Sequence, residues 1–211
     1  MKTTALIPVK QFESSKTRLE LTRNQKNVLT ELMLKSTILN LKKCKSISTI
    51  VTISADEKVE TISKYYNVKF IFSKEKGVNY AVELGDDYCK ESLVNTNIVV
   101  PIDLIFLDPN EIELLLSMSR KFHKCSIIVP SMRLDGTNIL IRRPFNLYET
   151  SYDNNSYCNH IRSSKKTGAR TIVVKSVNLA EDLDTMEDYE RIIAHPINKL
   201  SKLISRIPTV I

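Results

Sequence analysis

The sequence predicts an α/β fold, a single Rossmann-like domain whose mostly parallel sheet carries helices on both faces. Short runs rich in β-branched residues recur along the chain and alternate with segments of helical periodicity. Several of these runs are apolar almost without alternation, which is typical of strands covered on both sides. No repeat, low-complexity stretch or long linker divides the 211 residues. We therefore expect one domain over residues 1–211.

The strands of this sheet are predicted from the short apolar runs. Each is flanked by polar or turn-forming residues, and together they are interrupted often enough to leave room for connecting helices. In chain order the predicted strands cover residues 4–9, 48–54, 68–72, 97–101, 126–130, 138–141 and 171–174.

The helices are predicted from apolar spacing and from capping residues. Residues 24–43 place apolar side chains at three- and four-residue intervals. Asp56 is a good N-cap, and Asp108 is an N-cap followed by Pro109 at the first helical position. Gly168 stands where a helix C-cap glycine is expected. The predicted helices cover residues 24–43, 57–66, 77–93, 110–121, 156–167 and 187–205.

Composition excludes several classes of protein. At 42 % hydrophobic and 26 % charged residues the chain is not intrinsically disordered. No apolar run reaches the roughly 18–20 residues of a membrane span, and the apolar stretch at the start is too short for a signal peptide. The four cysteines have no C-x-x-C spacing, which argues against a zinc site and a disulfide framework. These observations predict a soluble, cytoplasmic protein.

The chain carries 31 Lys and Arg against 24 Asp and Glu, a formal charge of +7. Such a balance fits nucleic acid, an anionic membrane surface or small polyanions such as nucleotides. The basic residues are spread along the chain and are not interleaved with aromatic residues as in a single-strand-binding groove. Solvated helix faces explain most of them better, so nucleic acid is not the expected partner.

In a parallel sheet, ligands bind beyond the carboxyl ends of the strands. The loop after the first predicted strand brings Lys10, Lys16 and Arg18 to that edge. Arg forks onto phosphate oxygens and Lys acts as a point charge, so the loop suits a triphosphate. It contains no glycine and is therefore not a P-loop. Taken alone, a solvated basic loop explains it as well.

Carboxylates follow two other predicted strands. Asp103 comes after the fourth strand, and Asp182 and Asp184 come after the last. Carboxylates from separate segments opposite a cationic loop are what Mg²⁺ needs to bridge nucleotide phosphates, because Mg²⁺ prefers hard oxygen ligands. The alternative is that Asp182 or Asp184 caps the helix that follows Thr185.

Glycine and histidine provide further candidates. With four glycines in the chain, Gly77 and Gly136 stand at turns where a ligand or a positive φ could require them. No Ser-His-Asp or Cys-His arrangement is evident. His160 follows Ser156 at helical spacing, so the two share one face of a helix.

These segments appear in one order that resembles a known family. The resemblance is carried by I-P-V-K with K-T-R-L in residues 7–19, G-V-N-Y-A in 77–81, P-I-D-L in 101–104, P-S with D-G-T-N-I-L in 130–140, Y-D-N-N-S in 152–156 with His160 and Gly168, and D-L-D-T-M-E-D in 182–188. Each motif is only moderately specific, but their common order runs through nearly the whole chain. It is similar to the 2-phospho-L-lactate guanylyltransferase (CofC) family of coenzyme F-420 biosynthesis.

The resemblance implies the fold of nucleotide-diphospho-sugar and molybdopterin (MobA-like) nucleotidyltransferases. It implies a guanylyltransferase that moves GMP from GTP onto the phosphate of 2-phospho-L-lactate, phosphoenolpyruvate or 3-phosphoglycerate, with release of pyrophosphate and with Mg²⁺. A homodimer is compatible with the family. The implied roles are catalysis for Lys16, Arg18 and Asp103; GTP binding for Lys10, Gly77 and Asn79; acceptor binding for Thr137, Asn138, Asp153, Ser156 and His160; and metal binding for Asp103, Asp182 and Asp184.

The sequence departs from the family pattern at three positions. Ile105 and Met186 replace prolines, which the loop and the helix start tolerate. Asp153 replaces a glycine expected to offer its backbone to the acidic substrate. Asp tolerates a left-handed backbone, but its carboxylate repels an anion unless it points away. This change bears on the identity of the acceptor substrate more than on the type of reaction.

Three alternatives stay open at this point. The chain could be another nucleotidyltransferase of the same fold, acting on molybdopterin or a sugar phosphate, although the usual glycine-rich first loop is missing. It could be a basic nucleic-acid-binding module without catalysis. It could also be a catalytically silent homologue, for which Asp153 is the one indication.

Overall fold

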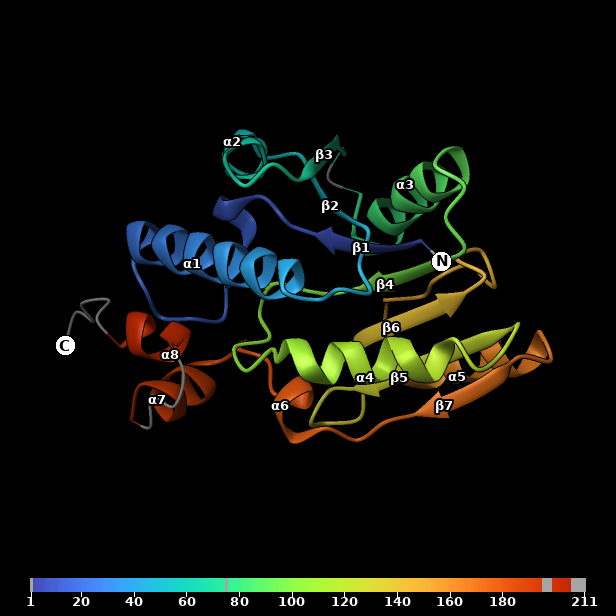
Figure 1. Cartoon of the computed structure of the whole chain (residues 1–211). Helices are drawn as coiled ribbons and strands as arrows, with labels where there is room; N and C mark the ends of the chain where they lie inside the picture. The colour runs from blue at the N-terminus through green and yellow to red at the C-terminus, as the bar shows by residue number, and fades with distance from the viewer. Residues whose placement is uncertain (1, 75, 195–198, 206–211) are drawn as a thin grey trace.

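The computed structural model of the chain describes residues 2–74, 76–194 and 199–205. Its centre is one seven-stranded sheet of order β3-β2-β1-β4-β6-β5-β7 (Figure 1). Every predicted strand is present, with bounds that differ by no more than a few residues. The strands are β1 (Thr3–Pro8), β2 (Thr49–Ser54), β3 (Lys69–Phe72), β4 (Thr96–Val99), β5 (Cys125–Pro130), β6 (Thr137–Arg143) and β7 (Arg170–Val173).

The sheet is mostly parallel, as predicted, and β6 is its antiparallel strand. β6 runs against both β4 and β5, whereas the other neighbouring strands pair in parallel. Because β6 is reversed, its first residues, Thr137 and Asn138, lie at the edge where the other strands end. The reversal thus brings the start of β6 to the expected ligand-binding edge.

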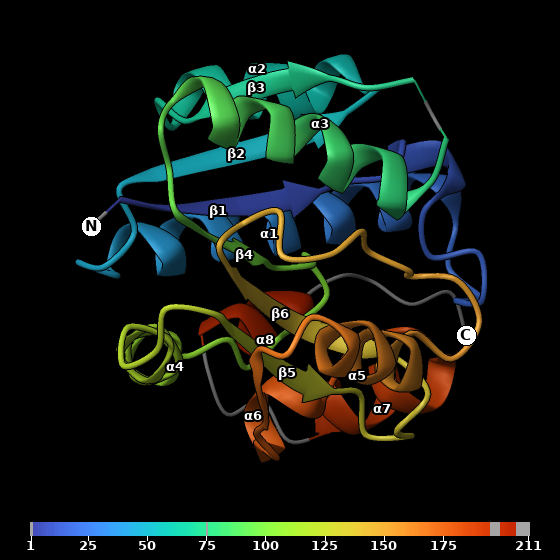
Figure 2. The same ribbon diagram turned by 90° about the vertical axis from the view of Figure 1, so that its right-hand side faces the viewer.

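Helices cover both faces of the sheet, as Figure 2 shows with α3 and α5 in front. α3 contacts β1, β2 and β4, and α5 contacts β5, β6 and β7. Most of the other helices pack their apolar residues into the core on the opposite face. The helices are α1 (Arg23–Lys42), α2 (Glu57–Tyr65), α3 (Val78–Glu91), α4 (Pro109–Ser119), α5 (Ser156–Lys166), α6 (Val177–Ala180), α7 (Met186–Ala194) and α8 (Lys199–Ile204), with a 3-10 turn η1 (Phe12–Ser14).

Two short elements were not predicted, and two described helices fall within or beside the last predicted one. η1 and α6 contain three and four residues, too few to show a helical period in a sequence. α7 and α8 fall on the helix predicted over 187–205, and residues 195–198 between them lie outside the described residues. None of the described helices is long and apolar enough to cross a bilayer.

The predicted helix caps are confirmed. Asp56 accepts a hydrogen bond from the Lys58 N–H at 2.8 Å, and Asp108 accepts one from Asn110 at 2.9 Å with Pro109 at the start of α4. Gly168 has a φ of 70° just after α5, where an L side chain would be strained.

Close packing of α3 on the sheet depends on Gly85. A Cβ atom there would lie 2.7 Å from Cδ1 of Leu6, a fully buried residue of strand β1. Leu6 would have to shift to make room for it. Gly85 therefore lets the helix approach the strands whose ends carry the basic loop.

Asp56 also fixes that loop, because its second oxygen accepts the Phe12 N–H at 2.8 Å. We expect Asp56→Ala to lower the free energy of unfolding by about 1–2 kcal/mol, since it removes both a cap and a loop anchor. Asp108→Ala removes a cap alone and should cost less. Urea denaturation of the two variants measures the difference, and equal losses would contradict an anchoring role for Asp56.

Candidate functional site

A cavity of about 480 Å³ opens at the edge of the sheet where β1 and β4 end and β6 begins. It collects most of the residues that the sequence singled out from distant parts of the chain. Its wall includes Lys10, Lys16, Arg18, Asp103, Thr137, Asn138, Ser156, Asp182 and Asp184. The convergence of the basic loop with the downstream aspartates is therefore present in the structure.

The wall of this cavity contains the Lys16 ammonium group, which is paired with two carboxylates. Lys16 Nζ lies 2.8 Å from Asp103 Oδ2 and 2.9 Å from Asp184 Oδ1, and only 7 % of its side chain is exposed. Its backbone has a φ of 53°, a conformation that L residues seldom adopt outside sites where surrounding structure enforces it. Burial alone would lower the pKa of Lys16, but the attraction of both carboxylates raises it, so the group stays charged.

Backbone pairing holds the two acidic segments together. The Leu183 N–H donates to the Asp103 carbonyl oxygen at 3.1 Å, and Leu104 and Asp182 form an isolated antiparallel bridge. Burial, followed by repulsion from Asp103 and Asp184, raises the pKa of Asp182 to about 6. The segments thus concentrate negative charge at one point of the cavity.

Asp182 and Asp184 were also considered as caps of α7. In the structure Thr185 takes the capping position. The Thr185 hydroxyl oxygen accepts from the Asp188 N–H at 3.3 Å, and the Asp188 carboxylate accepts the Thr185 N–H at 2.9 Å. This is a reciprocal capping arrangement. Asp182 and Asp184 are left to the cavity.

The donor set at this point suits a hard divalent cation. Across the described ranges, no group of three or more His, Cys, Asp or Glu side chains already surrounds a common point. The Lys16 ammonium lies between two of the carboxylates, those of Asp103 and Asp184. Carboxylate oxygens held around a positive charge are the ligands that Mg²⁺ prefers.

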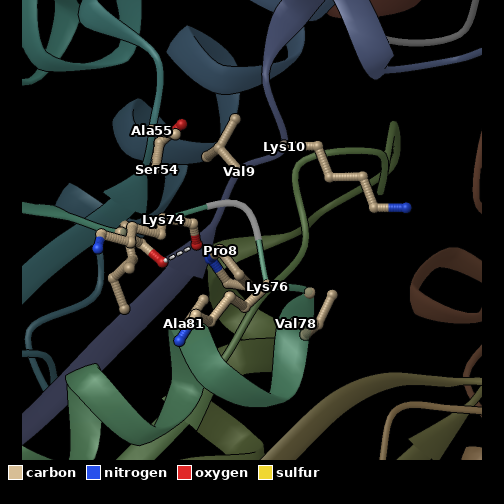
Figure 3. A pocket seen from close by; sticks show the side chains of 12 residues that line it. Pro8, Val9, Lys10, Ser54, Ala55, Lys74, Lys76, Val78 and Ala81 are labelled. Carbon is tan, nitrogen blue, oxygen red and sulfur yellow. Dashed lines mark hydrogen bonds between the residues drawn. The ribbon is translucent and has the colours of Figure 1, made fainter.

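A second cavity of about 310 Å³ adjoins the first (Figure 3). Its walls come from the ends of β1 and β2 and from the start of α3, including Gly77, which has a φ of 89°. Pro8, Lys10 and Val78 line both cavities. In Figure 3 the Lys10 side chain extends away from Ser54 and Ala55. Lys10 therefore stands at the junction of the two spaces.

Asn79 and Asp153 bind each other. The Asn79 amide donates to Asp153 Oδ2 at 3.0 Å and accepts the Tyr152 N–H at 2.7 Å. In the described part of the chain, the walls of both cavities are built without Asn79 and Asp153. The carboxylate at the family's glycine position is thus paired with an amide. The expected contacts of these two residues with ligands are not in place in this conformation.

Of the residues expected to bind the acceptor, three line the larger cavity, and His160 contacts one of them from behind. Thr137, Asn138 and Ser156 line the larger cavity, and the Asn138 amide donates to the Leu179 carbonyl at 3.0 Å. His160 is fully buried, and both of its ring nitrogens have protein partners. His160 does not line the cavity; its ring contacts Thr137, which does. A role for His160 in acceptor binding stays a prediction.

No role was predicted for Ser131 and Asp135 in the cavity wall or for the Arg142–Asp86 ion pair. Ser131 donates to Asp135 and accepts the Gly136 N–H at 3.0 Å, and Ser131, Asp135 and Gly136 all line the larger cavity. The D-G-T turn was the available signal for them. The buried Arg142–Asp86 ion pair lies behind the site, and no sequence pattern marked it.

Comparison with known proteins is consistent with this geometry. A family model described as "Guanylyl transferase CofC like" matches residues 3–206. The 2-phospho-L-lactate guanylyltransferase of Methanocaldococcus fervens is 28 % identical over 93 % of this chain and 87 % of its own. The 3-phospho-D-glycerate guanylyltransferase of Colwellia psychrerythraea is 28 % identical over 96 % and 99 %. The phosphoenolpyruvate guanylyltransferase of Conexibacter woesei is 26 % identical over 90 % and 86 %.

The solved structures support the fold. A putative nucleotide-diphospho-sugar transferase from Desulfovibrio desulfuricans superposes with a TM-score of 0.78 at 13 % identity, covering 97 % of this chain and 94 % of the other. The sheet order and this likeness thus define the fold of the nucleotide-diphospho-sugar transferases. Within that class the match over residues 3–206 is decisive. The chain belongs to the guanylyl transferase CofC-like family.

Proposed function

We propose that this protein transfers GMP from GTP to the phosphate of a small phosphorylated carboxylic acid and releases pyrophosphate. The observation that carries the proposal is the buried Lys16 ammonium, held by Asp103 and Asp184 in the wall of the larger cavity. Such a charge arrangement suits polyanions that must be brought together. The three curated relatives described above are all named guanylyltransferases.

The two joined cavities divide the substrates between them. The smaller one, beside Gly77 at the start of α3, would take the nucleoside. Lys10 at the junction, with Lys16 and Arg18 beyond it, would hold the triphosphate. Asn79 would reach the nucleotide only after releasing Asp153 and Tyr152. Thr137, Asn138 and Ser156 in the larger cavity would hold the acceptor.

The reaction needs positioned charge more than a protein nucleophile. A phosphate monoester has a second pKa near ~6 and is largely dianionic at pH 7. One of its oxygens attacks the α-phosphorus of GTP, the new P–O bond forms, and the bond to the bridging oxygen of the β-phosphate breaks. The electron pair leaves with pyrophosphate. Lys10, Lys16 and Arg18 would stabilise the negative charge on the triphosphate.

Asp103, Asp182 and Asp184 would hold Mg²⁺, and Lys16 would then turn its charge toward the phosphates. When bound, Mg²⁺ supplies charge neutralisation at the phosphate oxygens. The support for this assignment is the concentration of partly buried carboxylates and the Lys16 ammonium found between two of them.

The proposed acceptor is a small acid that carries both a phosphate and a carboxylate. The positive charge of the site and the names of the relatives both support this class. Their names give three acceptors, 2-phospho-L-lactate, phosphoenolpyruvate and 3-phospho-D-glycerate, each of which combines a phosphate with a carboxylate. Asp153 lines neither cavity in this conformation, and its carboxylate accepts a hydrogen bond from Asn79. The product would serve coenzyme F-420 biosynthesis, as the family resemblance implies.

Incubation of the purified protein with each nucleoside triphosphate, Mg²⁺ and each of the three acids tests the proposal. Pyrophosphate release is expected with GTP and at least one acid, and not with GTP alone. Release with CTP and a sugar phosphate would indicate another nucleotidyltransferase. A lack of turnover together with RNA or DNA affinity that falls steeply with salt would indicate a nucleic-acid-binding protein.

A further inference from the structure

We propose that His160 is a positioning residue that acts as an uncharged hydrogen-bond donor and turns the Thr137 hydroxyl proton toward the acceptor acid. The inference rests on the proposed function for the identity of the acceptor. The polarity of the hydrogen bonds follows from the structure alone. Each step starts from a group whose role as donor or acceptor is chemically fixed.

The first fixed group is the backbone N–H of Ser151, which can only donate. It lies 3.0 Å from His160 Nε2, so Nε2 must be the acceptor and carries no proton. A neutral imidazole then has its proton on Nδ1. Nδ1 lies 2.9 Å from Thr137 Oγ1, so the ring donates to the threonine hydroxyl.

The second step concerns the direction of the hydroxyl protons. Because Thr137 Oγ1 accepts from His160, its own proton must point elsewhere, and Thr137 lines the larger cavity. The Thr137 N–H donates to Ser156 Oγ at 2.9 Å, which sets Ser156 as an acceptor in the same way. Among the described residues neither hydroxyl is seen to donate to a protein group. Two O–H donors therefore face the cavity, as carboxylate or phosphate oxygens require.

The surroundings of the ring keep it neutral. Burial and, as the smaller cause, the positive charge of Arg142 on β6 together lower the pKa of His160 to about 4. Arg142 is itself paired with Asp86 of α3. The rings of Tyr148 and Tyr152 pack beside the imidazole, with centroids 6.2 and 4.8 Å away. Protonation would also set an N–H of the ring against the Ser151 N–H, so the imidazolium is disfavoured on geometry as well.

The tautomer can be observed without any substrate. In ¹⁵N–¹H correlation spectra of the histidine-labelled protein, we expect His160 to appear as the Nδ1–H tautomer and to stay neutral down to about pH 5. His160→Asn identifies the signal by its disappearance. An Nε2–H tautomer, or titration near the ordinary pKa of about 6.5, would overturn the inference. This readout is independent of catalysis.

Two amide variants test the two hydrogen bonds of the ring one at a time. The amide of His160→Asn can replace Nδ1 and donate to Thr137, whereas that of His160→Gln can replace Nε2 and face Ser151. We expect His160→Gln to raise KM for the acceptor about 10–100-fold and to leave KM for GTP nearly unchanged, because a hydrogen bond to an anion is misdirected. His160→Asn should retain most of the acceptor affinity.

A double-mutant cycle with Thr137→Val completes the test. If His160 acts through the threonine hydroxyl, His160→Gln should add little once that hydroxyl is gone. Additive effects, or equal losses in KM for GTP and acceptor, would show a merely structural role and overturn the inference. Inactivity of the wild type with every phosphorylated acid would instead refute the proposed function, and the tautomer measurement would still decide on His160.

Discussion

Asp103→Asn is expected to reduce pyrophosphate release by about 10³-fold or more while leaving the fold intact. Asn keeps the size of the side chain but removes the charge that positions Lys16, 2.8 Å away, and that would hold Mg²⁺. Loss of a single preorganised group of this kind costs about 10²–10³ in rate, and loss of a metal ligand adds to it. The effect should appear in kcat with Mg²⁺ at saturation.

The fold should survive because Asp184 remains paired with Lys16 at 2.9 Å. The backbone bond from Leu183 to the Asp103 carbonyl does not depend on the side chain. Asp108→Asn is a matched control, since it neutralises a nearby carboxylate and Asn caps a helix as well as Asp. Thermal unfolding and GTP binding are measured on both variants. Retained GTP-dependent pyrophosphate release in Asp103→Asn would remove this residue from the mechanism.

The sequence predicted the strands well because each is a short apolar run, and a buried parallel sheet leaves few other ways to place such runs. It also predicted which strand ends meet, since the carboxyl ends of parallel strands share one edge. The elements it missed, η1 and α6, are too short for periodicity to register. The antiparallel direction of β6 depends on the turn before it and on its neighbours, which a single sequence does not show.

At the site, residue types were predicted better than contacts. Lys16 and Asp103 could be expected at the same edge of the sheet. Their ion pair joins residues 87 positions apart and depends on tertiary structure, which the sequence alone does not show. Asn79 and Asp153 were expected to face ligands, and in the structure they form an exposed hydrogen bond with each other. A single sequence does not show this pairing, because the two residues lie 74 positions apart. His160 was recognised by its spacing from Ser156, and its burial behind Thr137 required the structure.

The second large effect is expected from Arg142→Met, which should lower the free energy of unfolding by about 3–5 kcal/mol at pH 7.5. Arg142 is fully buried, and its guanidinium lies 2.7 Å from Asp86 Oδ1 and donates to the Tyr148 carbonyl at 2.8 Å. Removing it leaves a largely buried carboxylate without its cation, although the Asn97 amide still donates to that carboxylate. Urea denaturation measures the loss.

The loss should grow with pH. Burial raises the pKa of Asp86 from 3.8 to about 6, even though Arg142 opposes the rise, so without Arg142 the pKa of the folded state is higher still. Between the unfolded pKa and the folded pKa the folded state binds more protons, and stability therefore falls as pH rises. For the wild type this fall ends near pH 6. For Arg142→Met it continues above pH 6, so the two stability curves should separate between pH 5 and 8.

Replacing both partners distinguishes lost charge pairing from lost packing. Arg142→Met combined with Asp86→Leu leaves no buried charge, and such apolar replacements of an ion pair are often close to neutral. We expect the double variant to regain much of the stability and to lose the pH-dependent separation. A gap from the wild type that stays constant between pH 5 and 8 in the single variant would mean that Asp86 is not the group responsible. The destabilisation would then come from the lost hydrogen bond to Tyr148 and from packing.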